Sequence, residues 1–355
     1  MHQKNRFIFL FSTLILVLSM MLAACQPAAT PEPTVAPTLP PTLGTAENPI
    51  KVLFVPSVDA NVIVTGGEIM ADALKEATGY EFEVSVPTSY AATVEEMCAS
   101  PEDTMGFLPP QPYVFANELC GVDVSSKAVR RGYSTYWTQF LVKRDSDIKT
   151  MEDLAGKSWG FPDPGSTSGY LFPAAMFKDM GIEVGEKVET GGQPQSVKAV
   201  YDGSVDFATS YFSPYGKPED EPKWVEGDAP DIPDELVPEC KIVDDALMCG
   251  DYLVLDARQT VRVEAPDVVQ EVRILGLTPA IPNDTLSFGP DFPADVRAKV
   301  EEALLAFSKT PAWADSLGNE DFYGWTGLDP ATDADYDFVR LMIESAGIKV
   351  EDLDK

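Results

Sequence analysis

The chain has 355 residues, and its 57 Asp and Glu against 26 Lys and Arg give a formal net charge of −31 at pH 7. Such an excess of carboxylates disfavours binding to nucleic acid or anionic lipid, and it repels anionic ligands at long range. We therefore expect any anion site to use local dipoles and neutral donors. The only histidine is His2, so the rest of the chain lacks Ser-His-Asp catalysis, Cys-His catalysis and histidine-held metals.

The N-terminal 49 residues have the composition of a targeting segment and a spacer. Lys4 and Arg6 precede an apolar run that ends in Leu22-Ala23-Ala24-Cys25. This ending resembles a bacterial lipobox, which implies that residues 1–24 are a lipoprotein signal peptide and that Cys25 is lipidated. A plain signal peptide and an uncleaved membrane anchor are the alternatives. Residues 25–49 are rich in Pro, Thr and Ala, so we expect an extended stalk without a core.

Four further cysteines, Cys98, Cys120, Cys240 and Cys249, contain no Cys-x-x-Cys pair. This spacing disfavours zinc binding and thiol redox chemistry. An even number in an exported protein indicates two disulfides, for which three pairings are possible. Proximity along the chain favours Cys98–Cys120 and Cys240–Cys249, and buried free thiols are the alternative.

Apolar patterns predict strands that alternate with helices, as in βαβ units with a parallel sheet. In the first half we expect strands at 50–55, 80–86, 105–108 and 133–142, and helices at 68–78, 90–98 and 113–119. A second series has strands at 158–161, 205–210, 272–277 and 285–288, and helices at 150–154, 170–180, 195–201, 295–308 and 335–346.

This order predicts an α/β protein with two lobes, each a mostly parallel sheet flanked by helices. We expect residues 50–140 and 283–355 in lobe 1 and residues 141–282 in lobe 2, with extended crossings near 138–144 and 278–286. The acidic, Pro-rich residues 217–240 are expected to form a surface loop inserted in lobe 2. Ligands of such sheets bind outside the carboxyl ends of strands, here in the cleft that hinge closure would bury.

The segment 163–170 places Ser166, Thr167, Ser168 and Gly169 between an apolar strand and an apolar helix. The first backbone N–H groups of a helix have no partner inside it, and the helix dipole favours negative charge there. Hydroxyl groups at the same turn add donors without adding charge. The segment therefore predicts an anion site, and an ordinary helix N-cap is the alternative.

Five motifs between about residue 50 and residue 304 are characteristic of one family: Ser89-Tyr90-Ala91-Ala92, Leu108-Pro109-Pro110-Gln111-Pro112-Tyr113-Val114, Glu152-Asp153-Leu154-Ala155-Gly156-Lys157, Ser166-Thr167-Ser168-Gly169-Tyr170 and Ala199-Val200-Tyr201-Asp202-Gly203. On these motifs the chain resembles bacterial substrate-binding lipoproteins of ABC transporters for phosphonate, phosphite and phosphate. The resemblance implies a type II periplasmic-binding fold that captures a small phosphorus oxyanion. It implies that Ser166, Thr167 and Ser168 hold the oxygens, and that Tyr90 and Tyr113 donate from the opposite wall.

One departure from the family concerns Gln193, which stands where the family usually has a histidine. An amide donates a hydrogen bond but cannot become positively charged, so this change bears on which anion is bound. Gln193 is alternatively a loop residue without a role. Tyr211 follows a predicted strand, where it either lines the cleft or packs in the core.

Together these features predict a monomeric, membrane-tethered binding protein outside the cytoplasm. It would deliver a phosphonate, phosphite or phosphate to an ABC permease, without catalysis, cofactor or metal. A sulfonate, an organic acid or a pyrimidine-like nutrient is the alternative ligand on the same fold. A sensory lipoprotein is a further alternative, and an enzyme would have to depend on an Asp/Glu acid–base pair.

Overall fold

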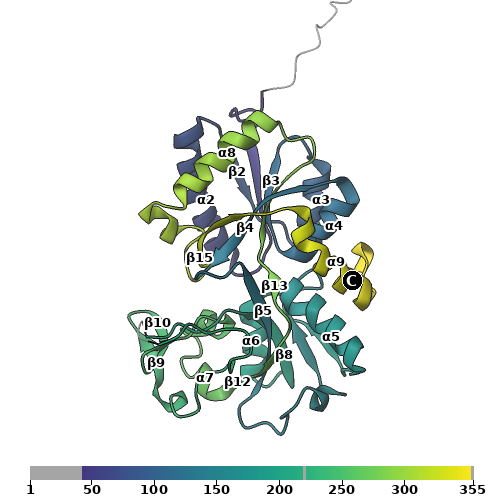
Figure 1. The fold of residues 1–355 in the computed structure, drawn as a ribbon, viewed down its shortest axis with the longest axis vertical. Helices are drawn as coiled ribbons and strands as arrows, with labels where there is room; N and C mark the ends of the chain where they lie inside the picture. Colours follow the sequence, from purple (N-terminus) through teal and green to yellow (C-terminus); the bar gives the residue numbers. More distant parts are fainter. Residues whose placement is uncertain (1–41, 219–220, 353–355) are drawn as a thin grey trace, which may run out of the picture. The chain divides into compact units, whose positions relative to one another are not determined.

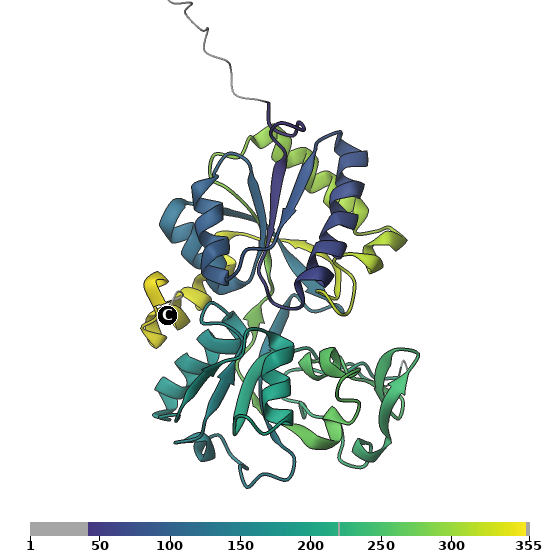
Figure 2. The same cartoon turned by 180° about the vertical axis from the view of Figure 1, so that it is seen from behind.

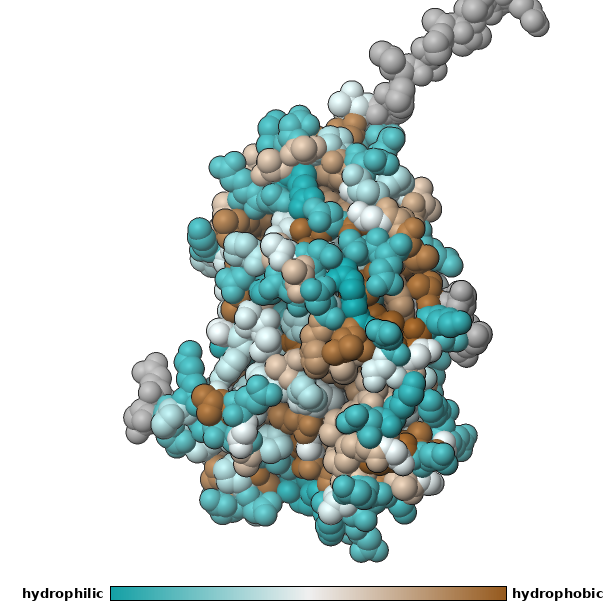
Figure 3. All heavy atoms as spheres, turned by 45° about the vertical axis from the view of Figure 1, so that its right-hand side comes forward, coloured by the Kyte–Doolittle hydropathy of each residue, from teal (hydrophilic) through white to brown (hydrophobic). Residues whose placement is uncertain are grey.

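The computed structural model describes residues 42–218 and 221–352. The predicted signal peptide, the predicted lipidation site Cys25 and residues 26–41 of the predicted stalk lie outside these residues. The prediction of an extended stalk is wrong for residues 42–49, which form a turn on the first lobe with Leu43 packed against its core. Within the described part, no helix is both long and apolar enough to cross a membrane. Figure 3 shows hydrophilic side chains over most of the face seen there, with apolar side chains in small groups between them.

The first lobe is built on one mixed six-stranded sheet with the order β15-β4-β14-β3-β1-β2. β1 runs parallel to β2 and β3, whereas β14 and β15 pair antiparallel with their neighbours. The strands are β1 (Ile50–Phe54), β2 (Phe82–Ser85), β3 (Thr104–Leu108), β4 (Asp123–Arg130), β14 (Thr285–Phe288) and β15 (Trp325–Pro330). Figure 1 shows α2 (Ala60–Thr78) and α8 (Ala294–Phe307) on one side of this sheet and α3 (Tyr90–Ala99) and α4 (Pro110–Cys120) on the other.

The second lobe contains another mixed sheet, with the order β12-β5-β8-β6-β7 and with β13 paired to β5. β6 runs parallel to β7 and β8, but β5 is antiparallel to β8, β12 and β13. The predicted fold of two helix-flanked sheets is confirmed, and both sheets are mixed because β5 and β14, which follow the two crossings, run in the reverse direction. The strands are β5 (Thr135–Lys143), β6 (Trp159–Phe161), β7 (Lys187–Glu189), β8 (Phe207–Phe212), β12 (Val272–Leu277) and β13 (Ile281–Pro282).

The helices of the second lobe are α5 (Phe172–Met180), α6 (Gln193–Tyr201) and α7 (Val268–Glu271). A small sheet of β9 (Cys240–Val243), β10 (Ala246–Cys249) and β11 (Tyr252–Leu253) extends it on one side. The C-terminal α9 (Asp337–Ala346) packs against α4 of the first lobe and α5 of the second. Phe338 of α9 and Phe172 of α5 lie with ring centroids 5.8 Å apart.

The chain crosses between the lobes at two adjacent places, visible in Figures 1 and 2. The first crossing is the turn Arg131-Gly132 between β4 and β5. It is not the predicted segment 138–144, because residues 138–143 lie within β5 and pair with β8 and β12. The second crossing contains β13, and Asn283 Nδ2 there donates to the carbonyls of Ala128 and Tyr133, each at 2.9 Å. The two crossings therefore support each other.

Both predicted disulfides are confirmed. Cys98–Cys120 joins α3 to α4, and Cys240–Cys249 joins the directly opposed residues of the β9–β10 hairpin.

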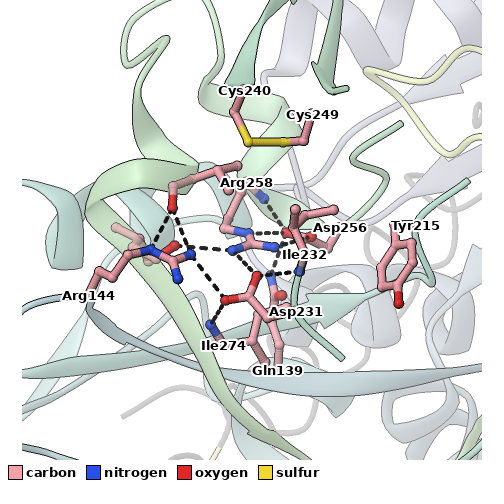
Figure 4. A network of polar contacts seen from close by, with 12 residues as sticks. Gln139, Arg144, Tyr215, Asp231, Ile232, Cys240, Cys249, Asp256, Arg258 and Ile274 are labelled. Atoms are coloured by element: carbon pink, nitrogen blue, oxygen red, sulfur yellow. Dashed lines mark hydrogen bonds and ion pairs between the residues drawn. A yellow bond between two sulfur atoms is a disulfide. The ribbon is translucent and has the colours of Figure 1, made fainter. Parts of the chain in front are cut away.

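The acidic insertion is not only the surface loop that its composition predicts. Trp224 and Ile232 are each only 2% exposed and belong to the core of the second lobe. Asp231 pairs with the buried Arg258 at 2.7 Å and with Arg144 at 3.2 Å, as Figure 4 shows. Because a buried arginine needs carboxylate partners, this network holds the insertion to the lobe.

Candidate functional site

A cavity of about 50 Å³ lies where the two lobes meet. This volume is enough for a few water molecules or for one small tetrahedral group. The first lobe contributes Val55, Ser57, Val58, Tyr90, Pro109, Arg130, Asp284, Glu320, Phe322 and Tyr323, and the crossing contributes Arg131. The second lobe contributes Tyr136, Ser166, Thr167, Ser168, Gln193, Tyr211 and Ser213.

The hydroxyl-rich turn forms one wall of this cavity. Ser166 caps a π-helical turn (Thr167–Leu171) that continues directly into α5, and its Oγ accepts from the N–H of Gly169 at 3.0 Å. Gly169 has to be glycine, since a Cβ there would lie 2.3 Å from the ring of Pro162. The N–H groups of Thr167 and Ser168 stand at the first positions of the helix, where no intrahelical acceptor exists.

Hydrogen bonds between the lobes close the structure around this turn. The N–H of Gln111, at the start of α4, donates to Thr167 Oγ1 at 2.8 Å, and Gln111 Nε2 donates to the carbonyl of Pro164 at 3.3 Å. The N–H of Gln193 donates to the carbonyl of Ser57, also at 3.3 Å. The lobes are thus in contact, and the cavity is covered from both sides.

Gln193 is held by both ends of its amide. Its Nε2 donates to Ser166 Oγ at 3.1 Å, and its Oε1 accepts from the N–H of Tyr211 at 3.1 Å. The side chain is 5% exposed and lines the cavity. Gln193 therefore connects the hydroxyl-rich turn to β8.

The three predicted tyrosines lie in different places. Tyr90 and Tyr211 line the cavity, and burial raises the pKa of both phenols, so both keep their protons as potential donors. Tyr113 is not among the lining residues. Its hydroxyl donates to Asp333 at 2.7 Å, and its ring lies 4.8 Å from that of Tyr336. Tyr113 is a packing residue in this structure.

Two arginines that sequence reasoning missed also line the cavity. Arg130 ends β4, and its Nη2 lies 3.1 Å from Asp284 Oδ2. Its guanidinium carbon lies 5.7 to 5.9 Å from the ring centres of Tyr136, Tyr211 and Tyr323. The expectation of purely neutral donors is therefore wrong.

Arg131 occupies the left-handed conformation (φ 51°) in the tight turn with Gly132 (φ 86°). A two-residue turn with both residues at positive φ suits adjacent antiparallel strands, although it is unusual for arginine. Arg131 pairs with Glu320 and donates from Nη1 to the carbonyl of Leu255 at 3.1 Å. Burial lowers the pKa of Arg131 to about 10, so it remains charged at neutral pH.

The Nε atoms of Arg130 and Arg131 are buried and have no hydrogen-bond partner among the described residues. Buried donors of this kind are costly to leave unpaired. Both side chains line the cavity, and each carries one buried N–H that no described protein acceptor uses. An Arg-Arg-Gly sequence in so acidic a chain was the available sequence signal for them.

Asp284 is the opposing charge of the site. It is 7% exposed, and burial raises its pKa more strongly than the nearby Arg130 lowers it. Its carboxylate both orients Arg130 and repels an anionic ligand. Within the described ranges, no group of three or more His, Cys, Asp or Glu side chains is placed to hold a metal ion.

The geometry defines a class of protein: a two-lobed α/β receptor whose inter-lobe cavity gathers hydroxyl, amide and guanidinium donors. The family described as "ABC transporter, phosphonate, periplasmic substrate-binding protein" matches residues 52–336. The chain belongs to this family and is a periplasmic substrate-binding protein of an ABC importer. The resemblance found in the sequence is thereby confirmed.

Individual relatives are distant. The chain is 25% identical to the phosphate-import protein PhnD of Mycolicibacterium smegmatis, over 84% of this chain and 86% of the relative. It is 22% identical to the phosphonates-binding periplasmic protein of Escherichia coli K12, over 61% and 54%.

Solved structures share the fold. A binding component of an ABC phosphonate transporter from Pseudomonas aeruginosa has a TM-score of 0.62 at 16% identity, covering 86% of this chain and 94% of that one. PhnD1 of Prochlorococcus marinus in complex with methylphosphonate has a TM-score of 0.63 at 14% identity, covering 84% and 98%.

Proposed function

We propose that the inter-lobe cavity captures a small phosphorus oxyanion (a phosphonate, phosphite or phosphate) and that the protein presents it to an ABC permease. The observation that carries this proposal is that two arginines and the hydroxyl-rich turn line the same inter-lobe cavity, so that guanidinium and hydroxyl donors surround one small space. Charge-assisted hydrogen bonds to such donors are about twice as strong as neutral ones. The relative in M. smegmatis imports phosphate and the structure from P. marinus holds methylphosphonate, which supports this ligand class.

Eight of the lining residues have a role in this proposal. Ser166, Thr167 and Ser168 would bind oxygens through hydroxyl and backbone N–H groups, and Tyr90 would donate from the opposite lobe. Arg130 and Arg131 would supply the charge, which corrects the expected donor set. Gln193 would position Ser166 through the hydrogen bond that its Nε2 donates. The hydrogen bond that its Oε1 accepts from the N–H of Tyr211 would keep Tyr211 at the wall of the cavity. The cargo is bound and released without a chemical step.

The remaining parts of the proposal concern the context of the protein. Cys25 would carry a lipid that tethers the chain to the outer face of the cell membrane, with residues 25–41 as the stalk. The lobes would be those predicted, with residues 135–140 moved to the second lobe because they belong to β5, which pairs with β8. The protein would act as a monomer beside its permease.

Calorimetric titration of the full chain in detergent tests the ligand. The panel contains phosphite, methylphosphonate, 2-aminoethylphosphonate and phosphate, with sulfate and ethanesulfonate as sulfur counterparts. We expect micromolar or tighter binding to at least one phosphorus compound and weaker binding to its sulfur counterpart. Binding of ethanesulfonate alone would show that the ligand is a sulfonate and not a phosphorus oxyanion. No binding to any of the six compounds would refute the proposal.

A further inference from the structure

Asp284 is a buried carboxylate in a cavity that otherwise gathers donors for an anion. It lies in the second crossing, directly before β14. Its Oδ2 accepts from Arg130 Nη2 at 3.1 Å, and no other hydrogen bond to the carboxylate occurs within residues 42–218 and 221–352. Because Oδ1 is unpaired there and yet is not enclosed by protein atoms, it is available to a donor in the cavity.

The main chain fixes Asp284 at this place. Its carbonyl accepts from the N–H of Ala128 at 2.9 Å. The neighbouring Asn283 donates to the carbonyl of Ala128, and its own carbonyl accepts from the Tyr336 hydroxyl at 3.0 Å. A shift of the main chain away from the cavity would break these hydrogen bonds, so the carboxylate stays beside a bound ligand.

The charges around Asp284 balance before a ligand enters. Arg130 is the charged group beside it, and Arg131 and Glu320 line the same cavity and pair with each other. The other titratable groups that face Asp284 are phenols from α3, from β5 and from the segments that precede β15 and α9. Burial raises the pKa of each of these phenols, so they stay neutral: Tyr90, Tyr136, Tyr323 and Tyr336.

A carboxylate that faces a bound anion in a buried cavity needs a proton between the two groups. Like charges at short distance are poorly screened there, and one of the two groups is driven to take up a proton. Phosphate-type groups lose their second proton near neutral pH, with a pKa of about 6 in phosphoserine, so such a ligand can bring the proton itself as a P–OH group. A sulfonate holds no such proton, and its binding would require Asp284 to take one from solvent.

We propose that Asp284 determines the specificity of the site: its carboxylate accepts a hydrogen bond from the P–OH group of a singly protonated phosphorus oxyanion and disfavours sulfonates and sulfate. The inference rests on the proposed function, since it requires a phosphorus oxyanion in the cavity. The arginines and the hydroxyl-rich turn would bind the remaining oxygens. No covalent bond changes, and the proton lies between the ligand oxygen and Oδ1.

The test compares methylphosphonate with methanesulfonate, which has nearly the same shape and no ionisable proton at neutral pH. Both are titrated calorimetrically into the full chain in detergent at neutral pH. We expect methylphosphonate to bind at least about tenfold more tightly, the effect of one hydrogen bond to a charged group. Asp284→Asn, whose amide can donate to an unprotonated oxygen, should reduce this ratio to about threefold or less, mainly by tightening the binding of methanesulfonate. Asp291→Asn, at an exposed position beyond the other end of β14, is the matched control and should leave the ratio unchanged.

A second measurement does not depend on a variant. Binding heats in two buffers of different ionisation enthalpy give the number of protons taken up with each ligand. At a pH below the second pKa of methylphosphonate, methanesulfonate should take up more protons than methylphosphonate, and its affinity should rise as the pH falls. A carboxylate that only orients Arg130 would give the same proton uptake with both ligands.

The outcomes separate this inference from the proposed function. If methylphosphonate binds but the ratio is unchanged in Asp284→Asn, or proton uptake is equal for the two ligands, Asp284 is not the acceptor and the proposed function stands. Equal affinities of the unchanged chain for the two ligands, or no binding of methanesulfonate to Asp284→Asn, would also overturn the inference. Failure of methylphosphonate and the other phosphorus compounds to bind the unchanged chain would refute the proposed function and the inference with it.

Discussion

The Arg130→Met substitution tests the central feature of the site. It keeps much of the side chain's apolar length and removes the guanidinium that lies 3.1 Å from Asp284 and lines the cavity. Both side chains are only 11% exposed, so solvent screens their interactions weakly. The substitution therefore removes a charged donor and leaves a carboxylate that faces the ligand.

The expected loss of affinity has two parts. A hydrogen bond to a charged group contributes about 1.5–3 kcal/mol. The unpaired Asp284 carboxylate would then repel an anion in a poorly screened cavity, which adds a cost of similar order. Together they predict about 3–5 kcal/mol, or at least a hundredfold increase in the Kd for methylphosphonate measured by calorimetry.

A control is needed because removal of one partner of a buried ion pair costs about 3–5 kcal/mol of stability. The double variant Arg130→Met/Asp284→Asn removes both charges and should recover most of the thermal midpoint lost in the single variant. It should still bind methylphosphonate much more weakly than the unchanged chain. An Arg130→Met protein that binds methylphosphonate with unchanged affinity would refute this account of the site.

Three further variants test other parts of the site. Ser168→Ala should weaken binding by about 1–3 kcal/mol in calorimetry, because it removes a donor from a desolvated anion; an unchanged Kd would remove this hydroxyl from the site. Asp284→Asn should tighten binding at neutral pH. The raised pKa of Asp284 also predicts that the unchanged chain gains affinity as the pH falls through that pKa, for a ligand of constant charge, and that the variant lacks this gain. Gly165→Ala should weaken binding several-fold, because its Cβ would lie 2.6 Å from Tyr90 Cβ of the other lobe. Gly327→Ala, with no atom within 4 Å, is its control, and equal affinities of the two would contradict the close approach of the lobes.

The hydroxyl-rich turn could be predicted because its signals are local. An apolar strand, a Ser/Thr cap and an apolar helix follow one another within one segment, and the structure has β6, the capped turn and α5 in that order. The same holds for the βα units of the first lobe, where short connections keep sequence neighbours together. Gln193 followed from the resemblance, but its contacts with Ser166 and Tyr211 depend on tertiary structure.

The arginine site could not be predicted in the same way, because it depends on a strand without a clear pattern. β4 reads Asp-Val-Ser-Ser-Lys-Ala-Val-Arg, and only Val124 and Ala128 of it are buried. Its partners β14 and β15 come from residues 285–288 and 325–330, more than 150 positions later. Because β4 forms by pairing with these distant strands, its register with them also determines where Arg130 lies.

The net charge led to the wrong expectation of purely neutral donors for a related reason. At an ionic strength of about 0.1 M, exposed charges more than about 10 Å apart hardly interact, whereas buried groups are screened much less. Most of the −31 charge therefore has little influence inside the cavity, where Arg130, Arg131 and Asp284 decide the potential. The two arginines face two carboxylates, Asp284 and Glu320, so the charged side chains of the cavity balance; the raised pKa of Asp284 favours its protonation, which would leave the cavity favourable to an anion. A strongly acidic surface and an anion receptor are therefore compatible, provided that the cations are buried at the site.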